Sequence, residues 1–225
     1  MPLAFVKEEE KILSAIVNGR IAYYTQPIYC ISKERVEGYE ILSRLYIDDR
    51  IVSPAEFMWV FEKNGLPIFY ENLVDTAYRF AKKSEGCYYS INITEKEMRL
   101  GVDRYLIDSA RKNPGLSEFI AIELNEKTLY CDYVKSALAA IRREGYKIYL
   151  DDFGSEYSSI DPLLSESVAI DAIKIDGVFT QDLERSDLKK EALKKIKPFL
   201  DIFTDKIIVE FVSNEAVYRA VAECG

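Results

Sequence analysis

The chain has 225 residues, of which 48% are hydrophobic and 30% charged, which suits one well-buried domain near the usual size of an α/β barrel. Its net charge of −8 argues against binding to polymeric nucleic acid, although a small phosphodiester held by metal ions remains compatible. No apolar run approaches the roughly 20 residues that cross a bilayer, and Met1 to Glu10 do not resemble a signal peptide, so we expect a soluble cytoplasmic protein.

Short β-rich runs alternate with longer helical patterns, as is typical of parallel strands joined by crossover helices. The predicted strands are Ile21–Ile28, Val36–Ser43, Cys87–Ile93, Phe119–Leu124, Lys147–Asp151, Ala172–Ile175 and Lys206–Val212. Apolar residues at three-to-four spacing predict helices between them, such as Val74–Lys83, Asp132–Glu144 and Lys189–Phe203. This order predicts a single (β/α) barrel domain over residues 1–225.

Signals for helix ends support this interpretation. Ser53 is a candidate N-cap, Pro54 suits the first helical position, and Glu56 completes a capping box. Gly65 is placed where that helix should stop, and Gly145 is placed similarly before the strand that begins at Lys147.

The composition also limits the chemistry. There is no histidine, so catalysis near neutral pH must rely on carboxylates, lysine or bound metal. The four cysteines have no paired spacing, and they indicate neither a zinc site nor a disulfide framework.

Polar residues recur inside or just after the predicted apolar strands. They are Glu40, Asn92, Glu123, Asp151, Asp152, Lys174, Asp176 and Glu210. Burying an unpaired carboxylate costs several kcal/mol, so this recurrence indicates cations, ligands or a dense ion-pair network. In barrels of this kind, the carboxyl ends of the strands form the active face.

Strand alternation places some of these residues on shared faces. Glu40 shares a face with Leu42 and Arg44, and Lys174 shares one with Asp176. Oxygen ligands without histidine or thiolate suit Mg²⁺ or Mn²⁺, and the adjacent pair Asp151–Asp152 suits a site with two metal ions. The alternative is an ionic core in which Lys174 and Arg44 neutralise the acids.

From about Glu9 to its last residue, the chain resembles the EAL family of cyclic di-GMP phosphodiesterases. The resemblance rests on the order and spacing of several motifs: Gln26–Ile28, Gly38–Arg44 with Ile41 in place of the middle alanine, Ser90–Thr94, Glu123–Glu126, Asp151–Ser159 and Lys174–Asp176. It implies a (β/α)8-type TIM-like barrel that binds cyclic di-GMP and hydrolyses it to the linear dinucleotide pGpG.

The resemblance also implies roles for single residues. One or two Mg²⁺ or Mn²⁺ ions would be held by Glu40, Asn92, Glu123, Asp151, Asp152 and Glu210, with Asp152 shared between two ions. Lys174 would orient the attacking water. Together with Glu40 and Asp152, it would form the catalytic set. The substrate would contact Gln26, Leu42, Arg44 and Asp176, and Glu126 would brace the long loop.

At three positions the chain departs from the family pattern, and these departures favour weak or absent catalysis. Ser213 replaces the second glutamate of the seventh-strand motif, Glu156 replaces a usual glycine in the long loop, and the chain stops at Gly225, before the family's last strand. We therefore expect a short tail with a strand and a glutamine to follow Gly225. These departures also support the alternative of a weak or inactive EAL domain that acts as a cyclic di-GMP receptor or a protein-interaction module.

The resemblance covers a single EAL-like domain, and we expect no attached sensor or cyclase domain in these residues. Regulation is then expected to come from a protein partner, from formation of a homodimer or from expression.

Overall fold

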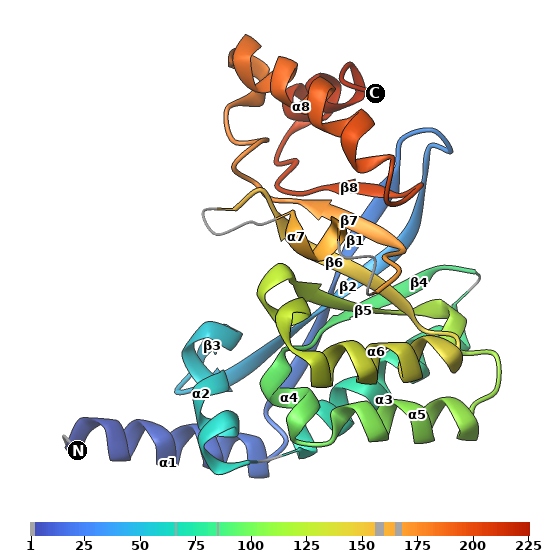
Figure 1. The fold of residues 1–225 in the computed structure, drawn as a ribbon. Coiled ribbons are helices and arrows are strands. Elements are labelled where there is room, and N and C mark those ends of the chain that lie inside the picture. The colour runs from blue at the N-terminus through green and yellow to red at the C-terminus, as the bar shows by residue number, and fades with distance from the viewer. Residues whose placement is uncertain (1–2, 66, 85, 156–159, 165–167) are drawn as a thin grey trace.

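The computed structural model describes residues 3–65, 67–84, 86–155, 160–164 and 168–225. Its sheet has the order β1-β2-β4-β5-β6-β7-β8, with β3 paired to β2, and it curls into a partial barrel (Figure 1). The strands are β1 (Ile21–Cys30), β2 (Arg35–Ile47), β3 (Arg50–Val52), β4 (Tyr88–Asn92), β5 (Ile120–Asn125), β6 (Lys147–Phe153), β7 (Ala172–Ile175) and β8 (Ile207–Val209). The predicted barrel class is confirmed.

Helices cover the outer side of this sheet. In Figure 1, α3, α5 and α6 lie side by side along the middle strands, and α8 lies beyond β8. The α-helices are α1 (Leu3–Val17), α2 (Pro54–Asn64), α3 (Ile68–Lys83), α4 (Glu95–Arg99), α5 (Val102–Lys112), α6 (Asp132–Arg143), α7 (Asp161–Leu164), α8 (Asp187–Leu200) and α9 (Glu215–Ala222). Short 3₁₀ helices are η1 (Ser117–Phe119), η2 (Glu126–Tyr130) and η3 (Leu183–Arg185).

One expectation about the strands was wrong. The first two strands, β1 and β2, are antiparallel rather than parallel, whereas the pairs from β2–β4 to β7–β8 are parallel. Only Ile31 to Glu34 separate β1 from β2. A connection this short closes a hairpin but cannot hold the crossover that a parallel pair requires.

Most of the predicted strands also have different boundaries in the structure, and only Ala172–Ile175 is reproduced without change. Phe119 belongs to η1, so β5 begins one residue later than expected. The last predicted strand, Lys206–Val212, pairs only over Ile207–Val209. Phe211 has a φ of 55°, and this left-handed backbone cannot continue an extended strand.

The predicted helix ends are confirmed. Ser53 and Glu56 form the capping box of α2, with Pro54 in the first turn, and Gly65 ends the helix with a φ of 59°. Gly145 follows α6 with a φ of 99°, a conformation that glycine adopts without steric cost.

The inside of the partial barrel contains a small apolar cluster that is separate from the main core. We call it the floor layer, and it consists of Tyr88, Ala121, Tyr149, Ala172 and Ile208. Tyr88 and Tyr149 pack edge to face, with ring centroids 5.6 Å apart. The Nζ atom of Lys206 lies 3.6 Å from the centroid of the Tyr88 ring. Tyr88 also packs on Gly38, where an added Cβ would lie 2.4 Å from the ring.

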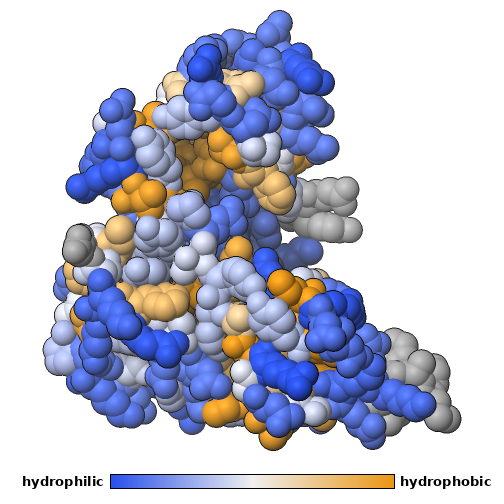
Figure 2. Space-filling model, turned by 180° about the vertical axis from the view of Figure 1, so that it is seen from behind, coloured by the Kyte–Doolittle hydropathy of each residue, from blue (hydrophilic) through white to orange (hydrophobic). Residues whose placement is uncertain are grey.

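The surface seen in Figure 2 is mostly hydrophilic, with hydrophobic residues in patches and in the recess of the upper half. Within the described residues, no helix combines the length and the apolar character needed to span a membrane. In the same part of the chain, β1 and β8 are the two edges of the sheet and do not pair with each other.

Candidate functional site

The carboxyl ends of the parallel strands bring four carboxylates around one ammonium group. Lys174 is on β7, and its Nζ atom has these acid partners: Glu123 Oε2 at 2.7 Å, Glu210 Oε1 at 2.9 Å, Asp151 Oδ1 at 3.0 Å and Glu40 Oε2 at 3.2 Å. We call these five residues the acidic layer. The sequence had separated them by up to 170 positions, and the fold places them in one shell.

Charge in the acidic layer is unbalanced, because four acids face a single lysine side chain that is 2% exposed. Burial alone would favour the neutral amine of Lys174. The surrounding carboxylates, Glu123 foremost, instead raise its pKa above the ordinary value, so the ammonium stays charged. Lys174 neutralises one acid at most, and the remainder leaves room for further cations.

Glu123 has the most perturbed carboxyl group of the layer. Its side chain is fully buried, and burial raises its pKa to about 8 despite the opposing effect of Lys174. One oxygen contacts Lys174, but the other, Oε1, has no hydrogen-bond partner among the described residues. A buried carboxylate oxygen without a partner costs free energy, and a cation would remove that cost.

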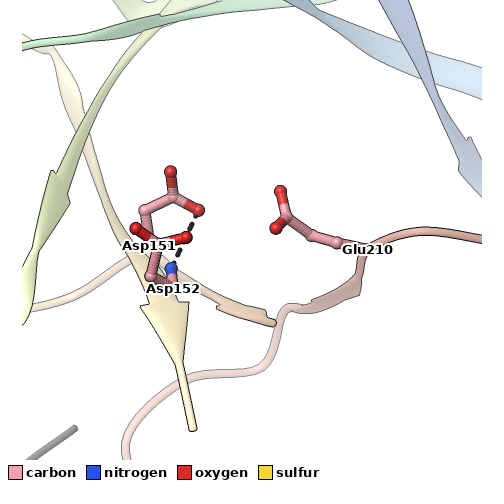
Figure 3. Close-up of side chains that lie close together, drawn as sticks. All are labelled: Asp151, Asp152 and Glu210. Carbon is pink, nitrogen blue, oxygen red and sulfur yellow. Dashed lines mark hydrogen bonds between the residues drawn. The ribbon is translucent and has the colours of Figure 1, made fainter. Parts of the chain in front are cut away.

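Asp151, Asp152 and Glu210 form a group that suits a metal ion. One oxygen from each lies within 4.8 Å of the others, and Figure 3 shows Glu210 facing the two aspartates. Burial and the neighbouring Asp151 raise the pKa of Asp152, and burial also raises that of Glu210. Asp152 has a φ of 58°, which is uncommon for a residue other than glycine and is typical of functional sites. The donor set is all oxygen, which fits Mg²⁺ or Mn²⁺.

Three further predicted residues lie next to this group. Asn92 ends β4 and donates from Nδ2 to Glu40 Oε1 at 2.8 Å. Asp176 follows β7 and accepts the backbone N–H of Val178 at 2.7 Å, and its charge contributes to the raised pKa of Asp152. Glu126 is buried at the start of η2, and its charge also acts on Asp152.

Three of the four predicted substrate residues lie along the β1–β2 hairpin. Gln26 is exposed and opposite Glu40, and Leu42 and Arg44 continue the same face of β2. Arg44 donates from Nη1 to the carbonyl of Ser43 at 2.8 Å. The structure records no salt bridge of Arg44 with an acid among the described residues, so of the two cations proposed to neutralise the acids only Lys174 does so.

Sequence reasoning gave Ser90 no role of its own and missed the floor layer. Ser90 is fully buried on β4, opposite Glu40 in the register, and its hydroxyl has no hydrogen-bond partner among the described residues. The alternation of Tyr88, Ser90 and Asn92 on one face of β4 was the available signal, but it contains no charge that would have drawn attention.

Of the residues that depart from the family pattern, Ser213 lies within the described residues and Glu156 does not. Ser213 lies in the exposed segment before α9, where its hydroxyl accepts from Asn214 Nδ2 at 3.3 Å. Glu156, with much of the loop Asp151–Ser159, lies outside the described residues.

The sequence was also compared with known protein families and proteins. The family model described as EAL domain matches residues 9–225. The cyclic di-GMP phosphodiesterase PdeA of Borreliella burgdorferi is 30% identical over 223 residues, which is 94% of this chain and 33% of that protein. The signaling protein YkoW of Bacillus subtilis is 26% identical over 98% of this chain and 28% of its own length. The chain thus spans about a third of these relatives.

Solved structures share the fold. A structure described as PaMucR phosphodiesterase in complex with c-di-GMP aligns with a TM-score of 0.84 and 20% identity, covering 97% of this chain and 92% of that one. The S helix-GGDEF-EAL structure of Vibrio cholerae LapD, bound to c-di-GMP, gives a TM-score of 0.80 and 18% identity over 97% of this chain and 54% of its own. With the family model matching nearly its whole length, this chain belongs to the EAL domain family.

Proposed function

We propose that this chain binds cyclic di-GMP and, with Mg²⁺ or Mn²⁺, hydrolyses it to pGpG in the cytoplasm. Family membership and the names of its relatives support this function. The observation that carries it is the excess of carboxylates around Lys174, together with the unpartnered buried oxygen of Glu123. An ionic core made only for stability has no need of more acids than its cation can compensate.

The ion-holding residues in this proposal come from six positions on the strand ends: Glu40, Asn92, Glu123, Asp151, Asp152 and Glu210. When bound, divalent ions supply an activated water and stabilise the charge on the phosphate and its leaving oxygen. Phosphodiester hydrolysis depends chiefly on positioning and electrostatic stabilisation, so a rigid set of carboxylates is suited to it.

The chain's own side chains have the remaining roles. Lys174 orients the attacking water and offsets charge that develops on the phosphate. Water adds to one phosphorus atom, the bond to the ribose 3′ oxygen breaks, and that oxygen takes up a proton, which gives pGpG. Gln26, Leu42, Arg44 and Asp176 hold the dinucleotide, and Glu126 braces the long loop.

A second function, a receptor that binds cyclic di-GMP without cleaving it, is favoured by one observation. Ser213 stands where the family pattern has a second glutamate, and it offers a hydroxyl at the exposed rim in place of a carboxylate. A missing rim acid weakens ion binding or water positioning more than it weakens contacts to the bases.

Incubation with cyclic di-GMP and Mg²⁺ or Mn²⁺, followed by chromatography, tests the two functions. We expect pGpG to accumulate. Tight binding without product would assign the receptor function, and neither binding nor product from folded protein would defeat both.

Variants separate the functional acids from structural ones. Glu40→Ala and Asp152→Ala should abolish hydrolysis and divalent-ion binding while the protein stays folded, because removing a crowded acid relieves repulsion. Glu215→Ala, an exposed acid on α9, is the matched control and should leave both unchanged. Unfolding at markedly lower temperature with unchanged ion affinity would instead indicate a structural ionic core.

A further inference from the structure

Two exposed tyrosines are joined to each other outside the acidic layer. Tyr24 on β1 and Tyr46 near the end of β2 are 43% and 38% exposed. Their hydroxyl oxygens lie 2.5 Å apart, although 22 residues separate them in sequence. Neither ring belongs to the hydrophobic core. The fold therefore holds two aromatic rings in fixed positions at the surface.

The strand register places this pair on the same face as the predicted substrate residues. Tyr24 is opposite Leu42, and Ala22 is opposite Arg44. Directly opposed residues of an antiparallel pair share a face, and so do alternate residues of one strand. Glu40, Leu42, Arg44 and Tyr46 thus follow one another along a single strip of β2, and the two tyrosines meet above the Ala22–Arg44 pair.

The distance along this strip suits a nucleotide. Tyr24 is level with Leu42, two residues from Glu40, which corresponds to about 7 Å at the rise of a strand. A phosphate held at the acidic layer would therefore have its attached base beside the Tyr24 ring, and Tyr46, six residues from Glu40, touches Tyr24 through its hydroxyl. The recognition chemistry is also suitable, because phenol rings stack on bases and an arginine fork matches the O6 and N7 acceptors of guanine.

The hydrogen bond between the two hydroxyls orients the rings before any ligand arrives. Tyrosine has few rotatable bonds, so ordering it costs little conformational entropy, and a partner on its hydroxyl lowers that cost further. We infer that Tyr24 and Tyr46 form a stacking subsite, beside Arg44, for one guanine base of the bound dinucleotide. This inference rests on the proposed function for its ligand.

The test is equilibrium binding of cyclic di-GMP to the full chain, measured by calorimetry, with the sample then checked for product by chromatography. Stacking contributes about 1–3 kcal/mol per base, so Tyr24→Ala and Tyr46→Ala should each weaken binding roughly tenfold. Tyr24→Phe and Tyr46→Phe keep the rings and should change affinity by no more than about threefold. Tyr29→Ala is the matched control, because Tyr29 lies at the far end of β1 and is 47% exposed.

A second ligand separates base contacts from phosphate contacts. Bis(p-nitrophenyl) phosphate has a phosphodiester but no purine, so its binding or hydrolysis should be the same in wild type and in the alanine variants. If wild type binds cyclic di-GMP and the alanine variants bind it equally well, the subsite is wrong while the proposed function stands. If wild type does not bind cyclic di-GMP, the proposed function fails and the subsite fails with it.

Discussion

On strand β6, Tyr149 and Asp151 lie two residues apart and point to the same side of the sheet, yet their surroundings are opposite. Tyr149 packs in the floor layer, against Tyr88 and beneath the Lys206 ammonium. Asp151 lies in the acidic layer at 3.0 Å from Lys174. The two layers repeat on the other strands: Ala121 precedes Glu123, Ala172 precedes Lys174, and Ile208 precedes Glu210, in each case by two residues.

The difference between the layers lies in how each handles charge. In the floor layer, burial lowers the pKa of Lys206 to about 8, so its neutral amine is within reach at ordinary pH, and its contacts are aromatic rings and the Tyr149 hydroxyl. In the acidic layer, burial raises the pKa values of Glu123 and Glu210, so these two acids resist ionisation. The floor is therefore built for packing, and the acidic layer is held by packing against its own repulsion.

Removing the central cation should have the largest effect on this balance. Lys174→Met leaves one buried and three partly buried carboxyl groups without their shared partner, and we expect the free energy of unfolding to fall by about 3–5 kcal/mol without divalent ions. Mn²⁺ should restore more stability in the variant than in wild type, since the ion replaces the lost charge. Urea unfolding with EDTA or with Mn²⁺ measures both effects.

Lys206→Met is the matched control in the floor layer. Methionine fills the space against the Tyr88 and Tyr149 rings without a charge, so stability should change by no more than about 1 kcal/mol, with no added response to Mn²⁺. If Lys174→Met and Lys206→Met lost equal stability and responded equally to Mn²⁺, the two layers would not differ in how they depend on charge.

A further effect of the acidic layer should be a fall in the free energy of unfolding as pH rises. Glu123 titrates near 4.5 when unfolded and at about 8 in the fold, so the fold keeps a proton that the unfolded chain releases earlier. The stability from this group is complete below pH 4.5 and is lost progressively as pH rises from 4.5 to 8, by roughly 4–5 kcal/mol in EDTA.

The variant Glu123→Gln cannot ionise, so it should lose most of that pH dependence and be more stable than wild type at pH 8 without ions. Urea unfolding between pH 5 and 8.5 provides the measurement. A wild-type protein whose stability rises over this interval would contradict the prediction.

Adding a single methyl group against the floor layer should lower the free energy of unfolding. Gly38→Ala places a Cβ 2.4 Å from the Tyr88 ring, and that ring is confined by Tyr149 and Lys206. We expect a loss of about 1–3 kcal/mol, as for other overpacked interiors. The added cost of Gly38→Ala should shrink in a Tyr88→Leu background, where the ring atoms are gone, and additive losses would argue against the contact.

The same two layers explain what sequence reasoning achieved. Acids after apolar strands predicted the acidic layer, because a buried charge is conspicuous in a strand and parallel strands align their carboxyl ends. The floor layer was missed, since Tyr88 and Tyr149 read as ordinary strand residues. The antiparallel β1–β2 pair was also missed, although the short connection from Ile31 to Glu34 was visible in the sequence. Which acids share Lys174 depends on the curl of the sheet, and no local pattern encodes that.

The smallest effect should come from the rim, where Phe211 follows Glu210. Its φ of 55° costs a residue with a Cβ about 1 kcal/mol, and its ring is 70% exposed, although it rests on Gly177. Comparing Phe211→Gly with Phe211→Ala separates these contributions, since both remove the ring but only glycine relieves the backbone. We expect the glycine variant to be more stable than the alanine variant by about 1 kcal/mol, or roughly 2–4 °C in Tm. Equal melting temperatures in calorimetry would show that the backbone at Phe211 is not strained.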